Sequence, residues 1–203
     1  WGKAVAMKLG IPFVSSTTTF AFNQYSSKIM KKSLVITLVA IAAVVLWLVG
    51  AYNGMVTAEE GVDTAWSQVE NVYQRRADLI PNLVATVKGY AQHESETLEG
   101  VVNARAKATQ ITVDPENLTP EALEEFNKAQ GELGSALGRL LAVTEAYPDL
   151  KANENFKELQ AQLEGTENRI ATERMKFNES AREYNTKMRS FPTNIIASMF
   201  GFE

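Results

Sequence analysis

The hydrophobic positions of this chain form one uninterrupted apolar run, followed by a long region in which apolar residues recur at heptad spacing. The run, residues 34–52, contains no charged residue. As a helix it would be ~28 Å long, close to the ~30 Å hydrocarbon thickness of a bilayer. Trp47 and Tyr52 lie near its C-terminal end, where amphipathic rings favour the headgroup level. The pattern predicts a single transmembrane helix, whose anchoring residues include Leu34, Leu38, Ile41, Leu46 and Trp47.

A cleaved signal peptide is the competing interpretation of this run. Val49, Gly50 and Ala51 loosely fit a small-residue cleavage site, and they follow a basic and then an apolar segment. The run is long for a cleaved signal, and the helical pattern resumes soon after it. We therefore favour a retained anchor.

From residue 62 onward, the heptad pattern predicts amphipathic helices that pack against one another. The first stripe consists of Val62, Trp66, Val69, Tyr73, Arg76, Ile80, Leu83, Val87 and Tyr90. A second stripe carries Phe126, Leu133, Leu140 and Tyr147, with Leu137 between them, and a third carries Phe156, Leu163, Ile170, Phe177 and Tyr184. Sustained heptads indicate nearly parallel helix packing, and they predict an all-α bundle.

Helix-breaking residues divide this region. Residues 114–120 are rich in Asp, Asn and Pro, and Thr119 followed by Pro120 is a typical helix start. Phe191 and Pro192 close the last long helix. At Pro81 the heptad phase continues unbroken, which favours a kinked helix, whereas the length of the segment favours a break.

Charges are sorted along the chain. All 24 Asp and Glu residues follow the apolar run, together with all but five of the 20 Lys and Arg residues. This acidic C-terminal region is a poor candidate for nucleic-acid binding. Because Lys28, Lys31 and Lys32 precede the run and Glu59 is the first charge after it, the positive-inside rule predicts a cytoplasmic N-terminus. The long C-terminal domain is then periplasmic, and the protein is a single-pass protein of the bacterial inner membrane.

Several segments resemble the LemA family. They are residues 74–84, residues 87–91 with His93 and Glu94, residues 156–160, residues 163–171, Arg174, residues 184–185, residues 191–192 and the ending at Gly201 and Phe202. The resemblance covers residues 30–203. It implies one N-terminal membrane helix followed by an antiparallel up-and-down four-helix bundle, and it favours a break at Pro81.

The resemblance also bears on function. No enzymatic activity is established for the family, and TPM-domain membrane proteins and HtpX-type membrane proteases are implied as partners. Some members are described with the N-terminus outside; we keep the opposite orientation for this chain because its charges indicate it.

The resulting domain division has four parts. Residues 1–29 lie outside the resemblance and are interpreted as a non-native or disordered extension, because Met30 with two lysines before an apolar run is typical of a true start. Residues 30–53 form the basic start and the anchor, residues 54–191 the bundle, and residues 192–203 an apolar tail.

No motif in the sequence predicts catalysis, a cofactor or a metal site. The chain contains no cysteine, and His93 is its only histidine, without the H-E-x-x-H spacing of a zinc protease. Gly131, Gly134 and Gly138 lie in a heptad helix with no strand before them, so they do not form a phosphate loop. They predict either close approach of another helix, from this chain or a neighbouring subunit, or simple tolerance on a surface.

Arg76 occupies a core position of the first stripe. A buried arginine needs a carboxylate partner, and we predict a pair with Glu167 or Glu173 that fixes helix register. The alternative is that Arg76 extends to solvent.

The C-terminal tail is the last apolar segment. Its large apolar residues are Ile195, Ile196, Met199, Phe200 and Phe202. The tail can pack on its own bundle, on a neighbouring subunit or on the membrane, and we expect docking on protein because no Lys or Arg follows Arg189.

Two functions remain open. The favoured one is a non-enzymatic, membrane-anchored scaffold or adapter that forms a homo-oligomer or binds a membrane partner. The alternative is a sensor that regulates a membrane protease or an envelope stress response.

Overall fold

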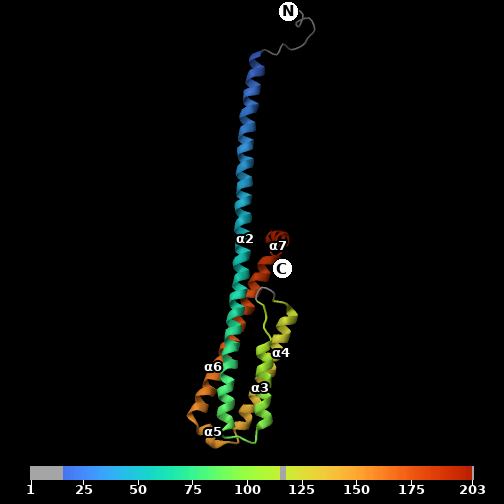
Figure 1. Cartoon of the computed structure of the whole chain (residues 1–203). Coiled ribbons are helices and arrows are strands. Elements are labelled where there is room, and N and C mark those ends of the chain that lie inside the picture. Colours follow the sequence, from blue (N-terminus) through green and yellow to red (C-terminus); the bar gives the residue numbers. More distant parts are fainter. Residues whose placement is uncertain (1–15, 115–117, 203) are drawn as a thin grey trace, which may run out of the picture. The chain divides into compact units, whose positions relative to one another are not determined.

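The computed structural model describes residues 16–114 and 118–202, with side chains from Lys31 onward. Within these ranges the chain is all-helical and contains no strand. Its elements are α2 (Ser16–Lys88), α3 (Ser95–Gln110), α4 (Pro120–Thr144), α5 (Pro148–Ala152), α6 (Glu154–Arg189) and α7 (Thr193–Phe200) (Figure 1). The chain divides into two compact units, Trp1–Asn53 and Gly54–Glu203, which are described separately. Of the proposed extension, residues 1–15 lie outside the described residues, and residues 16–29 belong to α2.

The first unit contains the apolar part of α2. Among the described residues, this is the one helix long and apolar enough to cross a membrane. All five predicted anchor residues are exposed: Leu34, Leu38, Ile41, Leu46 and Trp47. An exposed apolar helix surface of this length is what a lipid environment requires.

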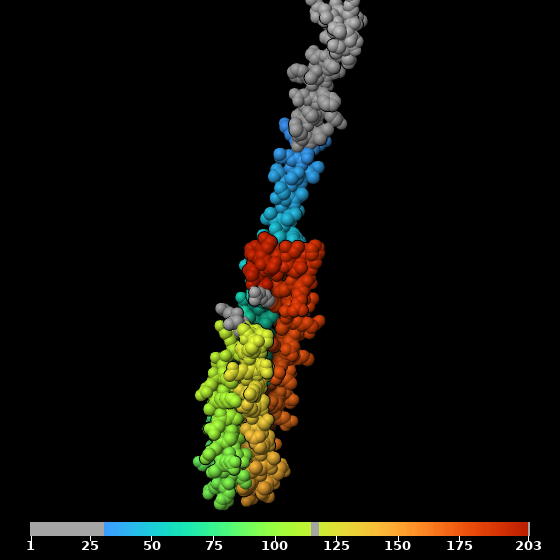
Figure 2. Space-filling model, turned by 90° about the vertical axis from the view of Figure 1, so that its right-hand side faces the viewer, coloured from blue at the N-terminus to red at the C-terminus, as the bar shows by residue number. Residues whose placement is uncertain are grey.

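The second unit has two apolar clusters in its core. The larger joins Ile80 and Leu83 of α2 to buried residues of α3, α4, α5 and α6, such as Leu133 and Leu163. The smaller contains Trp66, Val69, Tyr73, Val113, Phe126 and Ile170. Helices α3 and α4 lie side by side (Figure 2). The predicted stripe from Trp66 to Val87 is buried at every heptad position.

The start of α4 is confirmed as predicted. Thr119 Oγ1 accepts a hydrogen bond from the backbone N–H of Ala122 at 3.2 Å, and Pro120 is the first helical residue. A proline at this position sacrifices no helical hydrogen bond, since the first N–H groups of a helix have no helical acceptor.

The question left open at Pro81 is resolved against the break that the family resemblance favours. Helix α2 continues through Pro81 to Lys88, and the chain turns at residues 89–94 instead. Pro81 has no N–H for the carbonyl of Ala77, but Arg105 Nε of α3 donates to that oxygen at 2.7 Å. Another helix thus supplies the donor that Pro81 removes.

Candidate functional site

The most distinctive internal feature of the second unit is the side chain of Arg76, which lies between the two apolar clusters. It is 4% exposed. Its heptad neighbours are Tyr73, which belongs to the smaller cluster, and Ile80, which belongs to the larger one. A permanently charged group therefore separates two hydrophobic regions.

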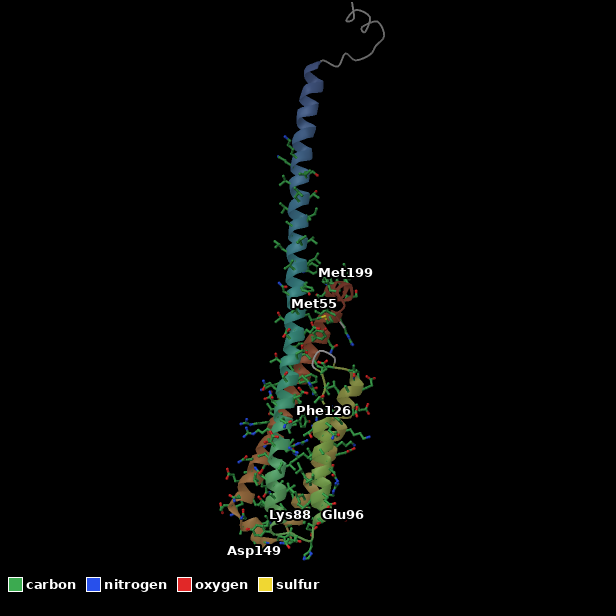
Figure 3. The ribbon with its side chains drawn as sticks, viewed as in Figure 1. Met55, Lys88, Glu96, Phe126, Asp149 and Met199 are labelled. Atoms are coloured by element: carbon green, nitrogen blue, oxygen red, sulfur yellow. The ribbon has the colours of Figure 1, made fainter. Side chains whose placement is uncertain are left out.

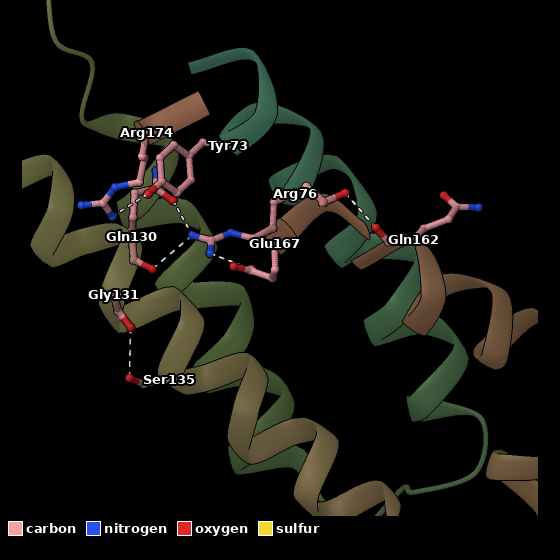
Figure 4. Close-up of polar contacts among 9 residues, drawn as sticks. Tyr73, Arg76, Gln130, Gly131, Ser135, Gln162, Glu167 and Arg174 are labelled. Carbon is pink, nitrogen blue, oxygen red and sulfur yellow. Dashed lines mark hydrogen bonds and ion pairs between the residues drawn. The ribbon is translucent and has the colours of Figure 1, made fainter. Parts of the chain in front are cut away.

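The guanidinium of Arg76 reaches two neighbouring helices (Figure 4). Its Nη1 lies 2.8 Å from Glu167 Oε1 of α6. Its Nη2 donates to Gln130 Oε1 of α4 at 2.7 Å and to the Gln130 carbonyl oxygen at 3.1 Å. Gln130 Nε2 in turn donates to the carbonyl oxygen of Ala108 in α3 at 3.3 Å. One side chain of α2 is thus connected to α3, α4 and α6.

Tyr73 completes the arginine layer, by which we mean Arg76, Gln130, Glu167 and Tyr73. The guanidinium carbon lies 5.0 Å from the centre of the Tyr73 ring, which is within cation–π range. The hydroxyl of Tyr73 accepts a hydrogen bond from Arg174 Nη1 at 3.2 Å. The electron-rich ring faces a cation, and its hydroxyl is bonded to a second arginine.

The layer matches donors of a buried arginine to acceptors on two other helices. Burying an arginine costs several kcal/mol unless its donors are matched, and Arg76 Nε is buried with no partner among the described residues. Glu167 remains 46% exposed, so its carboxylate keeps part of its hydration. A one-residue slip of α4 or α6 would leave the buried charge without acceptors.

Of the predicted polar core, the structure brings together Arg76 and Glu167. Glu173 instead lies 2.9 Å from Lys176 on its own helix. With Arg76 buried, the alternative in which it extends to solvent is wrong. Sequence reasoning missed Gln130, although it lies seven residues before Leu137, on a heptad position that the structure buries.

The glycine stripe of α4 faces outward at two of its three positions. A Cβ added at Gly131 or Gly138 would meet nothing within 4 Å, and one at Gly134 would lie 4.0 Å from Arg76 Nη1. Close packing against the described part of the chain is therefore absent at Gly131 and Gly138. Packing of these glycines against a neighbouring subunit stays a prediction.

The tail is only partly docked. In α7, Ile196 is buried, whereas Ile195, Met199 and Phe200 are exposed. Phe202 is half-buried, and its backbone N–H donates to the Ala197 carbonyl oxygen at 3.0 Å. Gly201 ends α7 with φ 77°, a left-handed conformation that glycine adopts without strain. Docking on this chain is thus observed for one face of the helix.

A groove of about 410 Å³ opens between α2, the start of α4 and α6. Leu123 and Phe177 contribute apolar surface, and Glu59 and Asp63 contribute carboxylates. Burial raises the pKa of Glu59, and the nearby charges of Asp63 and Glu60 raise it further. Among the described residues, no three His, Asp or Glu side chains are grouped to hold a metal ion.

Comparison with known proteins gives consistent matches. The sequence model of the LemA family matches residues 65–203. Magnetosome protein MamQ 2 of Paramagnetospirillum magneticum is 29% identical over 189 residues, which covers 84% of this chain and 69% of that protein. Magnetosome protein MamQ of Magnetospirillum gryphiswaldense is 28% identical over the same shares, 84% and 69%. Protein LemA of Metamycoplasma hominis is 27% identical over 149 residues, 73% of this chain and 64% of that protein.

Proposed function

Because this chain belongs to the LemA family, we propose that it is a membrane-anchored, non-enzymatic helical scaffold or adapter of the bacterial envelope. The observation that carries this proposal is the set of hydrogen bonds that the buried guanidinium of Arg76 makes. Its hydrogen bonds join α2 to α4 and α6. An apolar anchor followed by a helical unit with such an interior suits a protein that presents surfaces to partners.

The second unit is proposed to be an antiparallel up-and-down four-helix bundle formed by α2, α3, α4 and α6. The short turn at residues 89–94 supports this arrangement, since helices joined by a few residues pack as antiparallel neighbours. The connection from α4 to α6 through the five-residue helix α5 supports it in the same way.

The proposed location is the periplasmic side of the inner membrane. Lys31 and Lys32 before the anchor and Glu59 after it support this orientation. Protease added outside right-side-out inner-membrane vesicles should therefore digest the chain after Asn53. Complete protection of the second unit would reverse the orientation.

Self-assembly is proposed to use the outward glycine stripe of α4. Leucine at Gly131 and Gly138 should reduce the particle mass of the full chain in mild detergent without lowering its melting temperature, since both positions are open in the single chain. Gly165→Leu on α6 is the matched control, because its Cβ also meets nothing within 4 Å. An unchanged mass in the glycine variant would reject the stripe as the interface.

Extraction of the native protein tests the scaffold itself. A particle that contains only copies of this chain, or this chain with a TPM-domain protein, would support a scaffold or adapter. Stoichiometric recovery with an HtpX-type protease would instead support a regulator of proteolysis. A monomer without a partner under several detergents would contradict both functions.

A further inference from the structure

The outward side of α7 is a run of large apolar side chains at the end of the described chain. We define the α7 face as Ile195 and Met199 of α7 together with Phe191, which lies two residues before the helix. Phe191 is 82% exposed and Met199 is 75% exposed. Three large apolar side chains this exposed within nine residues of chain are unfavourable in water, and exposed apolar clusters commonly mark interaction surfaces. The α7 face therefore requires an occupant.

The opposite face of α7 already packs against this chain. Ile196 and Ala197 are both 4% exposed, and α7 packs against α6. The helix is thus held with one side on protein and the other turned outward. Figure 3 shows Met199 on this helix, at the end of the unit where Met55 lies.

A contact within the second unit places α7 beside the start of that unit. Lys187 Nζ, near the end of α6, donates to the carbonyl oxygen of Gly54 at 2.5 Å. Met55, the next residue, is fully buried. Because Phe191 follows Lys187 by only four residues, the α7 face begins within ~14 Å of this contact.

Chain connectivity then places the same contact beside the membrane. Gly54 follows Tyr52, the last residue of the apolar run, by two residues. Two residues of any backbone conformation span at most ~7 Å, whatever the inclination of one unit to the other. The interfacial layer of a bilayer is roughly 5–8 Å deep on each side. Gly54, and with it the contact from Lys187, therefore lies within or next to that layer.

We propose that the α7 face inserts into the membrane interface and forms a second, lateral attachment beside the transmembrane helix. The occupant is the headgroup–acyl boundary of the lipid leaflet next to Gly54. The expectation of docking on protein, drawn from the missing Lys and Arg, is met by the face that packs on α6. For the outward face, the absence of Lys, Arg, Asp and Glu from Ser190 to Phe202 means that insertion is driven by apolar burial alone and requires no desolvation of charge. It follows that zwitterionic lipid suffices and that anionic lipid adds little.

This attachment rests on the proposed membrane anchor, and the test separates the two. The chain has no cysteine, so single cysteines can carry a polarity-sensitive fluorophore in the full chain. The positions are Met199→Cys on the α7 face, Leu46→Cys in the anchor, and Met175→Cys as an exposed control on α6. Each variant is reconstituted at low protein-to-lipid ratio into phosphatidylcholine vesicles, with or without nitroxide-labelled lipid.

The labels at positions 199 and 46 should both emit at shorter wavelength than the label at position 175 and be quenched several-fold more strongly by nitroxide lipid. Ile195→Cys repeats the measurement in case labelling at 199 perturbs the tail. Adding anionic lipid should leave these values unchanged, and a requirement for it would overturn apolar insertion.

Quenching at 46 without quenching at 199 and 195 would overturn the lateral attachment and leave the anchor intact. No quenching at 46 would overturn the anchor, and the inference with it. A blue shift at 199 that grows with protein-to-lipid ratio without lipid quenching would overturn the inference and assign the α7 face to a second copy of the chain.

Discussion

The hydrogen bond from Arg105 to the carbonyl of Ala77 should contribute measurably to stability. Pro81 deprives this carbonyl of its helical donor, and Ala77 is buried. Arg105 Nε, at 2.7 Å, replaces that donor with a charged one. Hydrogen bonds to charged groups contribute ~1.5–3 kcal/mol, so Arg105→Met should lower the free energy of unfolding by that amount. Methionine keeps most of the apolar stem, which limits the effect of lost packing.

A second substitution tests whether the missing N–H of Pro81 is what makes the Arg105 hydrogen bond important. In a Pro81→Ala chain, residue 81 regains an N–H that can bond the Ala77 carbonyl within α2. The cost of Arg105→Met should then fall below ~1 kcal/mol, which corresponds to a coupling of about 1–2 kcal/mol between the two sites. Denaturant unfolding in mild detergent, followed by Trp66 fluorescence in a chain with Trp1 and Trp47 replaced by Phe, measures all four corners of the cycle.

Lys107→Met is the matched control on the same helix. Lys107 forms an ion pair with Glu132 at 2.7 Å, but both side chains are largely exposed. Such pairs contribute ~0–1 kcal/mol, and the stability cost of Lys107→Met should be the same whichever residue occupies position 81. If Arg105→Met costs the same in the chain with Pro81 and in the Pro81→Ala chain, Arg105 stabilises the fold through its stem, and the explanation of the continuous helix is refuted.

Three further predictions concern the core, one carboxyl and the tail. Gln130→Leu should lower the free energy of unfolding by about 2 kcal/mol or more, because it removes the side-chain acceptor of a buried guanidinium and disturbs the backbone acceptor beside it. Adding Arg76→Met should recover most of that loss. Denaturant titration measures both variants, and a double variant without recovery would contradict the pairing. Burial raises the pKa of Glu70 above its ordinary 4.5, although hydrogen bonds from Trp66 and Val113 act to lower it. The folded state therefore binds this proton more tightly than the unfolded state does. The contribution of Glu70 to the free energy of unfolding falls as pH rises from 4.5 through the raised pKa. Glu70→Gln should therefore stabilise the chain at pH 7 and have little effect near pH 4 in denaturant unfolding, and equal effects at both pH values would contradict this assignment. Deleting residues 193–203 should lower the melting temperature through loss of buried Ile196, and an unchanged value would show that α7 contributes nothing to the fold.

The core of the second unit was predictable from the sequence because a heptad repeat directly encodes which side of a helix is buried. Trp66, Leu133 and Leu163 are buried at their heptad positions. The membrane anchor was predictable for a similar reason, since an apolar run of this length has few other environments. Local rules also located the start of α4, where Thr119 and Pro120 act on neighbouring backbone groups.

The behaviour of Pro81 and Arg76 was decided by the tertiary structure. Pro81 removes a helical hydrogen bond in any context, but the donor that replaces it, Arg105, lies on another helix and is visible only in the folded chain. The sequence limited the partner of Arg76 to Glu167 or Glu173, and the position of α6 selected Glu167. Periodicity specifies the face of a helix, whereas the partner across an interface depends on how far each helix is shifted along its neighbour, and that shift is set only when all the helices pack together.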